Sequence, residues 1–177
     1  MNMSEHVVAG SAGKDFGDTL GFLLIRLWLS VRAVVTGIEK FAVSMASETP
    51  VVMDGTANTY GLTASSSEKV YSLSSHHGIP EVLYAKLQAE PLLPGFALRL
   101  LDASLGPVLI VLGLSLLLGL CTRISLFLMG LIYTSLTVGL ILLKQDAGVA
   151  WLGIHVLLVA FALSKVRHNR FALTRKY

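Results

Sequence analysis

Three apolar stretches without an acidic or basic residue follow one another almost directly in this chain. They cover residues 103–122, 124–143 and 147–164. A hydrocarbon layer about 30 Å thick requires about 20 apolar residues of helix to cross it, and a helix satisfies its own backbone polar groups there. The three stretches therefore predict three membrane-spanning helices.

A fourth apolar segment, residues 20–43, carries four charges but also predicts a membrane helix. Arg26, Arg32, Glu39 and Lys40 stand among runs of apolar residues. Charges near the ends of a span reach towards the lipid headgroups, whereas a charge near its middle must face protein or water. The composition agrees with this interpretation, since the mean hydropathy is +0.70 and only 14% of the residues are charged.

The four spans set the domain organisation. We expect a cytoplasmic N-terminal segment at 1–19, transmembrane helices at 20–43, 96–120, 123–143 and 149–165, an outer, periplasmic loop at 44–95 with a short helix near 80–88, and a basic cytoplasmic tail at 166–177. Short connections make the last three helices antiparallel neighbours. The predicted fold class is all-α: an integral membrane four-helix up-down-up-down bundle with one long outer loop.

Basic residues predict the orientation of these helices. One side holds Lys14, Arg123, Lys165, Arg167, Arg170, Arg175 and Lys176, and the other holds Lys69, Lys86, Arg99 and Lys144. Because the first set is larger and lies in shorter segments, the positive-inside rule places both termini in the cytoplasm. The basic residues do not form a patch with exposed aromatic residues, so the pI of about 9.1 reflects topology, and no nucleic-acid partner is expected.

The polar residues of the first helix fall on two faces. At about 100° per residue, one face holds Arg26, Ser30, Gly37 and Lys40, and the other holds Trp28, Arg32 and Glu39. Arg32 is the deepest cation in this span. A bare charge at that depth is very costly, so Arg32 requires a carboxylate, carbonyl groups or water beside it.

Six charged or ionisable residues are the candidate cofactor-binding set: Arg26, Arg32, Glu39, Lys40, Asp102 and His155. Glu39, Lys40 and Asp102 are expected at the outer ends of their helices. One interpretation is a pocket for an anion or a quinone headgroup at the edge of an apolar bundle. The alternative is a set of interfacial ion pairs that orient the helices.

His155 is the only imidazole within a predicted span, which bears on the choice of cofactor. A haem held by two histidines needs a second imidazole, so we expect no haem, and His155 serves either a helix-to-helix hydrogen bond or a quinone carbonyl. His76 and His77 adjoin each other without a spaced third ligand, so no metal is expected. No catalytic motif occurs, and catalysis by this chain alone is unsupported.

Three segments resemble the DoxX-like membrane proteins. The run LLIRLWLSVRAVVTGIEKFA (residues 23–42) is similar to the opening span of that family, with Arg26, Gly37 and Lys40 in its characteristic places. The run LGLSLLLGLCTRISLF (residues 112–127) resembles the family's glycine-punctuated helix that closes on a Thr-Arg pair. The tail NRFAL (residues 169–173) is similar to the family's short basic-aromatic tail.

The resemblance implies a four-helix protein of the bacterial or archaeal cell (inner) membrane. The group includes the DoxD-like small subunit of thiosulfate:quinone oxidoreductase, so we expect a membrane subunit in quinone-linked redox metabolism, with sulfur-compound oxidation as one branch, a quinone as cofactor and a protein partner. The enzyme would be a quinone-dependent oxidoreductase of which this chain is one subunit. The alternatives are a non-enzymatic scaffold or assembly factor that binds a partner through the outer loop and, third, a small transporter that assembles as a homo-oligomer.

Overall fold

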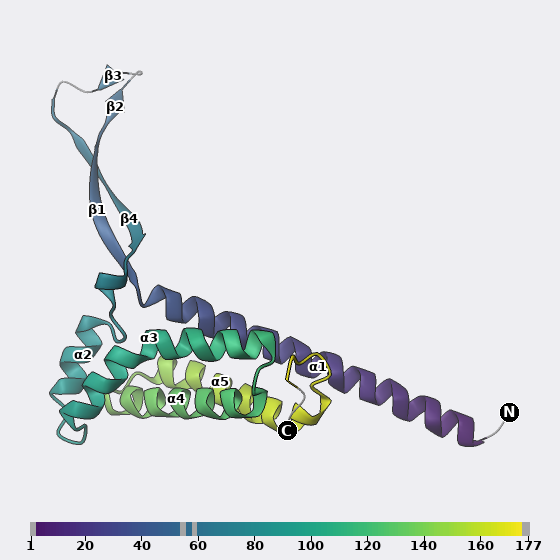
Figure 1. Ribbon diagram of the computed structural model, residues 1–177. Coiled ribbons are helices and arrows are strands. Elements are labelled where there is room, and N and C mark those ends of the chain that lie inside the picture. Colours follow the sequence, from purple (N-terminus) through teal and green to yellow (C-terminus); the bar gives the residue numbers. More distant parts are fainter. Residues whose placement is uncertain (1–2, 54–55, 58–59, 175–177) are drawn as a thin grey trace.

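The computed structural model describes residues 3–53, 56–57 and 60–174 (Figure 1). The helices are α1 (Met3–Glu39), α2 (Glu81–Gln88), α3 (Gly95–Leu118), α4 (Thr122–Leu142) and α5 (Asp146–Lys165), with the 3₁₀ turns η1 (Leu73–Ser75) and η2 (Val166–His168). The strands are β1 (Ala42–Pro50), β2 (Val52–Met53), β3 (Thr56–Ala57) and β4 (Thr63–Tyr71). The described chain is thus mostly helical.

Four helical segments are long and apolar enough to cross a membrane: Phe16–Glu39, Gly95–Leu118, Thr122–Leu142 and Asp146–His168. Their outward faces are as apolar as their inward faces. Leu24, Val111 and Leu157, for example, are 69%, 64% and 70% exposed. Such a surface suits hydrocarbon and not water, which confirms the membrane character expected from the sequence.

The long helices pack in two close pairs. α1 lies along α3 and α4 lies along α5, with further contacts between α3 and α4 and between α1 and α5. The centre is filled by the fully buried residues Leu29, Leu109, Leu116, Leu126 and Met129. The beginning of α1 and the end of the described chain lie at one end of the helices, and the strands project from the other end (Figure 1).

Glycines allow α1 and α3 to approach closely. A Cβ atom added to Gly113 would lie 2.7 Å from Val34 Cγ2 and 2.9 Å from the Ser30 carbonyl oxygen, and one added to Gly37 would lie 3.0 Å from the Gly106 carbonyl oxygen. Membrane helices gain little hydrophobic energy by leaving lipid for one another, so close van der Waals packing of small residues holds them together.

The outer segment contains strands that an all-α prediction misses. β1 pairs antiparallel with β4, from Ala42 opposite Tyr71 to Pro50 opposite Thr63, and the short strands β2 and β3 pair near the tip. Both long strands are rich in Ser and Thr and mostly exposed. They lack the alternation of apolar and polar residues that predicts a strand from sequence.

α1 also differs from the expected span at both ends. It begins at Met3, well before residue 20, because residues 3–19 are polar but contain no proline to stop a helix. It ends at Glu39, since the chain turns at Lys40 and enters β1 at Ala42. The first part of α1 therefore extends beyond the other long helices (Figure 1).

Candidate functional site

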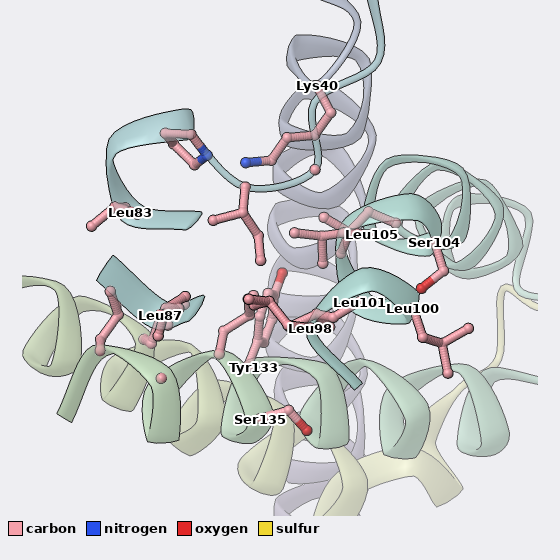
Figure 2. A pocket seen from close by; sticks show the side chains of 18 of the residues that line it. Lys40, Leu83, Leu87, Leu98, Leu100, Leu101, Ser104, Leu105, Tyr133 and Ser135 are labelled. Carbon is pink, nitrogen blue, oxygen red and sulfur yellow. The ribbon is translucent and has the colours of Figure 1, made fainter. Parts of the chain in front are cut away.

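A cavity of about 630 Å³ lies among the four long helices, at their hairpin end. Figure 2 shows it from close by, with Lys40 directed into it from the end of α1. Apolar side chains from α2, α3 and α4 form most of its wall, including Leu83, Leu87, Leu98, Leu101, Leu105 and Leu136. The polar groups of the wall are Arg32, Thr36, Lys40, Ser104, Tyr133, Ser135 and His155.

A short roof, formed by residues 78–80 and α2, covers the cavity at the hairpin end. The backbone N–H of Ile79 donates to Asp102 Oδ1 at 2.7 Å, which fixes the roof to α3. Gly78 packs so tightly on the Asp102 backbone that a Cβ atom would not fit. On the other side, Leu87 of α2 is in van der Waals contact with the Gly139 position on α4. Asp102 therefore holds the roof and does not face a ligand directly.

Lys40 supplies a cation at the upper wall of the cavity. Its side chain is half-buried because it follows directly on α1 and turns inward beneath the roof. Burial lowers the pKa of Lys40, and the nearby charges of Asp102 and Glu39 oppose that effect only in part. Lys40 forms no ion pair within 4 Å among the described residues, so its partly desolvated ammonium can donate to an acceptor oxygen of a ligand.

His155 offers a second polar group, from α5. The side chain is only 7% exposed, and Nδ1 lies 2.8 Å from the Trp151 carbonyl oxygen of the preceding turn. Nε2 is buried and has no hydrogen-bond partner among the described residues. With Nδ1 donating to the carbonyl, Nε2 is an acceptor in the neutral ring and a donor when the ring is protonated. An unsatisfied buried nitrogen on a cavity wall is a candidate ligand contact.

Tyr133 stands beside His155. The two rings meet edge to face with centroids 5.4 Å apart, and Tyr133 is 6% exposed. Arg32, on α1, also lines the cavity. Among the described residues that line the cavity none is Asp or Glu, so its charged and hydroxyl groups are matched to a ligand with acceptor oxygens.

The structure brings together only part of the candidate set. Arg32, Lys40 and His155 line the cavity, and Asp102 anchors its roof. Glu39 points away and forms an exposed ion pair with Lys69, with Nζ and Oε1 3.2 Å apart. The two faces of the first helix differ in burial, since Ser30 and Gly37 are buried while Trp28 is 58% exposed, yet Arg32 from one face and Lys40 from the other line the same cavity.

Arg26 lies outside the cavity, nearer the other end of the helices. Its Nη1 donates to Asn169 Oδ1 at 2.6 Å and to the Phe171 carbonyl oxygen at 2.8 Å. Asn169 in turn donates from Nδ2 to Thr122 Oγ1 at 2.9 Å. This buried network joins α1, the start of α4 and the C-terminal tail, and we call it the Arg26 clasp.

Sequence reasoning missed Tyr133 and the hydroxyl groups of Thr36, Ser104 and Ser135. One signal was available for Tyr133, because it is the only tyrosine within the four spans. The three hydroxyl residues gave no signal, since Ser and Thr occur on every face of these helices and commonly bond their own backbone. Ser135 does so, donating to the Leu131 carbonyl oxygen at 2.9 Å.

The part of the chain that the structure describes contains no group of three or more His, Cys, Asp or Glu side chains placed to hold a metal ion. Comparisons with protein-family models, with curated proteins and with solved structures find no match for this chain. The assignment of a function therefore depends on the cavity and its chemistry.

Proposed function

We propose that this chain binds a quinone in the cavity between its membrane helices and serves as the membrane subunit of a quinone-dependent oxidoreductase. The observation that carries the proposal is a largely apolar cavity whose wall includes Lys40 and His155, the latter with a buried Nε2 that has no hydrogen-bond partner among the described residues. Ligand sites of this kind combine apolar walls with a few polar groups that fix orientation.

The chemistry of the wall suits a quinone headgroup. A quinone presents an apolar ring and acceptor oxygens at its edge. Lys40 and Arg32 are cationic donors and Tyr133 is a hydroxyl donor. Since Nδ1 of His155 donates to the Trp151 carbonyl oxygen, Nε2 donates to a quinone oxygen when the ring is protonated and accepts from a quinol hydroxyl when the ring is neutral. The leucines of α2, α3 and α4 would enclose the ring and exclude water.

We further propose an up-down-up-down arrangement of the four spans across a bacterial or archaeal inner membrane, with both termini in the cytoplasm. The excess of Lys and Arg in the segments at the end opposite the hairpin supports this orientation. The resemblance to DoxX-like proteins supports a redox partner, with sulfur-compound oxidation as one candidate reaction. The partner would supply the electron donor, because this chain carries no catalytic motif.

The test is a direct measurement of quinone binding. The purified wild-type protein is titrated with ubiquinone in detergent and the bound quinone is extracted and quantified. His155→Ala and Lys40→Ala are each expected to weaken binding by about tenfold or more, the loss of one hydrogen bond to a buried or charged donor. Arg99→Ala is the matched control, because Arg99 is an exposed cation on α3 that does not line the cavity. Absence of binding to the wild-type protein would overturn the proposal.

A second candidate function is favoured by the hairpin of β1 and β4. Nine residue pairs extend this two-stranded ribbon away from the helices (Figure 1), and its residues are mostly exposed. A two-stranded ribbon is marginal on its own in water, so a partner that adds a strand to its edge would stabilise it. Under this second function, the chain is a membrane scaffold or assembly factor that binds its partner through the hairpin. A pull-down through the hairpin that returns a soluble redox enzyme supports the first function, and one that returns an unrelated envelope protein supports the second.

A further inference from the structure

Five lining residues of the cavity are also exposed on the outside of the protein: Arg32 on α1, Pro80 in the roof, Phe96 and Leu100 on α3, and Ser135 on α4. Phe96 and Leu100 of α3 are 76% and 67% exposed, and Ser135 of α4 is exposed as well. A side chain that borders a cavity and the exterior at once marks the place where the cavity opens. Phe96, Leu100 and Ser135 place one opening of the cavity on the side formed by α3 and α4.

The way α3 and α4 pack explains why the opening lies at the first half of α3 and the second half of α4. Near the connecting turn the two helices are held together, since Ser115 Oγ and Ser125 Oγ lie 2.9 Å apart. The lining residues of α3 come only from its first half, up to Leu109, and those of α4 only from its second half, from Tyr133 onwards. The helices are thus joined at one end and border the cavity at the other.

The residues that border this opening belong to apolar spans. Leu100 lies within the apolar span Gly95–Leu118 and Ser135 within the span Thr122–Leu142. Ser135 keeps its hydroxyl bonded to the Leu131 carbonyl oxygen, so it presents little polarity to lipid. At the hairpin end the roof of residues 78–80 and α2 covers the cavity. A ligand that reaches the cavity by the open side must come from the bilayer.

We infer that the opening between α3 and α4, bordered by Leu100 and Ser135, is a lateral portal through which the hydrocarbon tail of a membrane quinone passes and in which the tail remains while the headgroup is bound. This inference rests on the proposed function. A ligand with a polar headgroup and an apolar tail suits this arrangement, because Lys40 and His155 line the cavity and Phe96 and Leu100 border the opening. Each methylene buried there adds to affinity.

The experiment narrows the portal and compares two probes. Leu100→Trp and Ser135→Trp each add a bulky ring at the opening, one from each wall. Val111→Trp is the matched control, because Val111 is 64% exposed on the same helix and does not line the cavity. Binding of a ubiquinone with a long isoprenoid tail and of a ubiquinone without a tail is measured for the full chain in nanodiscs, alongside its thermal unfolding.

The expected result is a loss of about tenfold or more in affinity for the tailed quinone in both portal variants, a clearly smaller loss for the tailless quinone, and unchanged binding of both probes in Val111→Trp. Unchanged binding of the tailed quinone in both variants would overturn the portal. Equal loss of both probes in a folded variant would also overturn it, because the residue would then belong to the headgroup site. If the wild-type protein binds the tailless quinone alone, the portal is wrong and the proposed function stands. If it binds neither, both fail.

Discussion

Arg26 and Asn169 are 143 positions apart in the chain, yet a buried hydrogen bond of 2.6 Å joins them. Arg26 is 4% exposed and Asn169 is 7% exposed. The Arg26 clasp lies near the turn between α3 and α4, because the tail continues to Thr174, whose Oγ1 accepts from the Cys121 backbone N–H at 3.1 Å. A charge that sequence alone marks as a ligand contact thus holds the C-terminal tail against the helices.

Asn169→Ala is expected to lower the stability of the folded protein by about 1–3 kcal/mol, the cost of leaving a buried donor without its partner. Arg26 would lose one of its two acceptors, and Thr122 would lose the Asn169 amide. The measurement is the unfolding midpoint in detergent. Arg170→Ala is the control, because Arg170 is an exposed cation next in sequence. Equal midpoints for the two variants would show that the clasp contributes nothing.

Gly113→Ala is expected to destabilise the α1–α3 pair by about 1–3 kcal/mol. The added methyl would lie 2.9 Å from two backbone atoms, the Ser30 carbonyl oxygen and the Val34 nitrogen, so a helix must shift. Gly153→Ala is the control on α5. No atom lies within 4 Å of a Cβ there, and alanine is the better helix former. The thermal unfolding midpoint of Gly113→Ala should therefore fall, whereas that of Gly153→Ala should stay the same or rise.

The ion pair of Glu39 and Lys69 gives a prediction for the hairpin. The hydrogen bond and charge of Glu39 raise the pKa of Lys69 above its ordinary value of 10.5. A raised lysine pKa means that the protonated form is favoured by folding, so this contribution is present below pH 10.5 and is lost as the pH rises through the pKa of the folded state. NMR titration of the Lys69 ammonium should show the raised pKa, and Glu39→Gln should reduce the shift, since Glu39 is its largest cause. A wild-type pKa at the ordinary value would contradict the pairing in solution.

Hydrophobicity predicted the membrane helices because bilayer thickness sets the length of an apolar run. The exact residues at which the helices begin and end were harder to predict. α1 continues to Met3 through three glycines because residues 3–19 contain no proline, and it stops at Glu39 because Ala42 pairs with Tyr71 in the hairpin. Such a pairing between distant segments leaves no local trace when both strands are polar on both faces.

The sequence predicted only part of the candidate site, because here too the missing information lies in contacts between distant segments. The sequence marks every charge in a span as exceptional but does not say which neighbour it meets. Lys40 and His155 reach one cavity, whereas Arg26 meets Asn169 from the far end of the chain. Helical periodicity fixes the face of a residue on its own helix. Only packing decides what lies opposite, and Tyr133 became part of the site in that way.

The orientation of the four spans can be tested by chemical labelling of a cysteine that the chain already contains. Cys121, the single cysteine, is exposed at the turn between α3 and α4, at the end of the helices opposite the hairpin. In intact cells a membrane-impermeant maleimide should leave the wild-type protein unlabelled, since the positive-inside rule places this turn in the cytoplasm. In a Cys121→Ser background, Tyr60→Cys should be labelled from outside, because Tyr60 is 86% exposed near the hairpin tip. Permeabilised cells should give labelling of both. Labelling of Cys121 but not of Tyr60→Cys in intact cells would reverse the orientation, and labelling of both would show that the helices do not separate these two sites across the membrane.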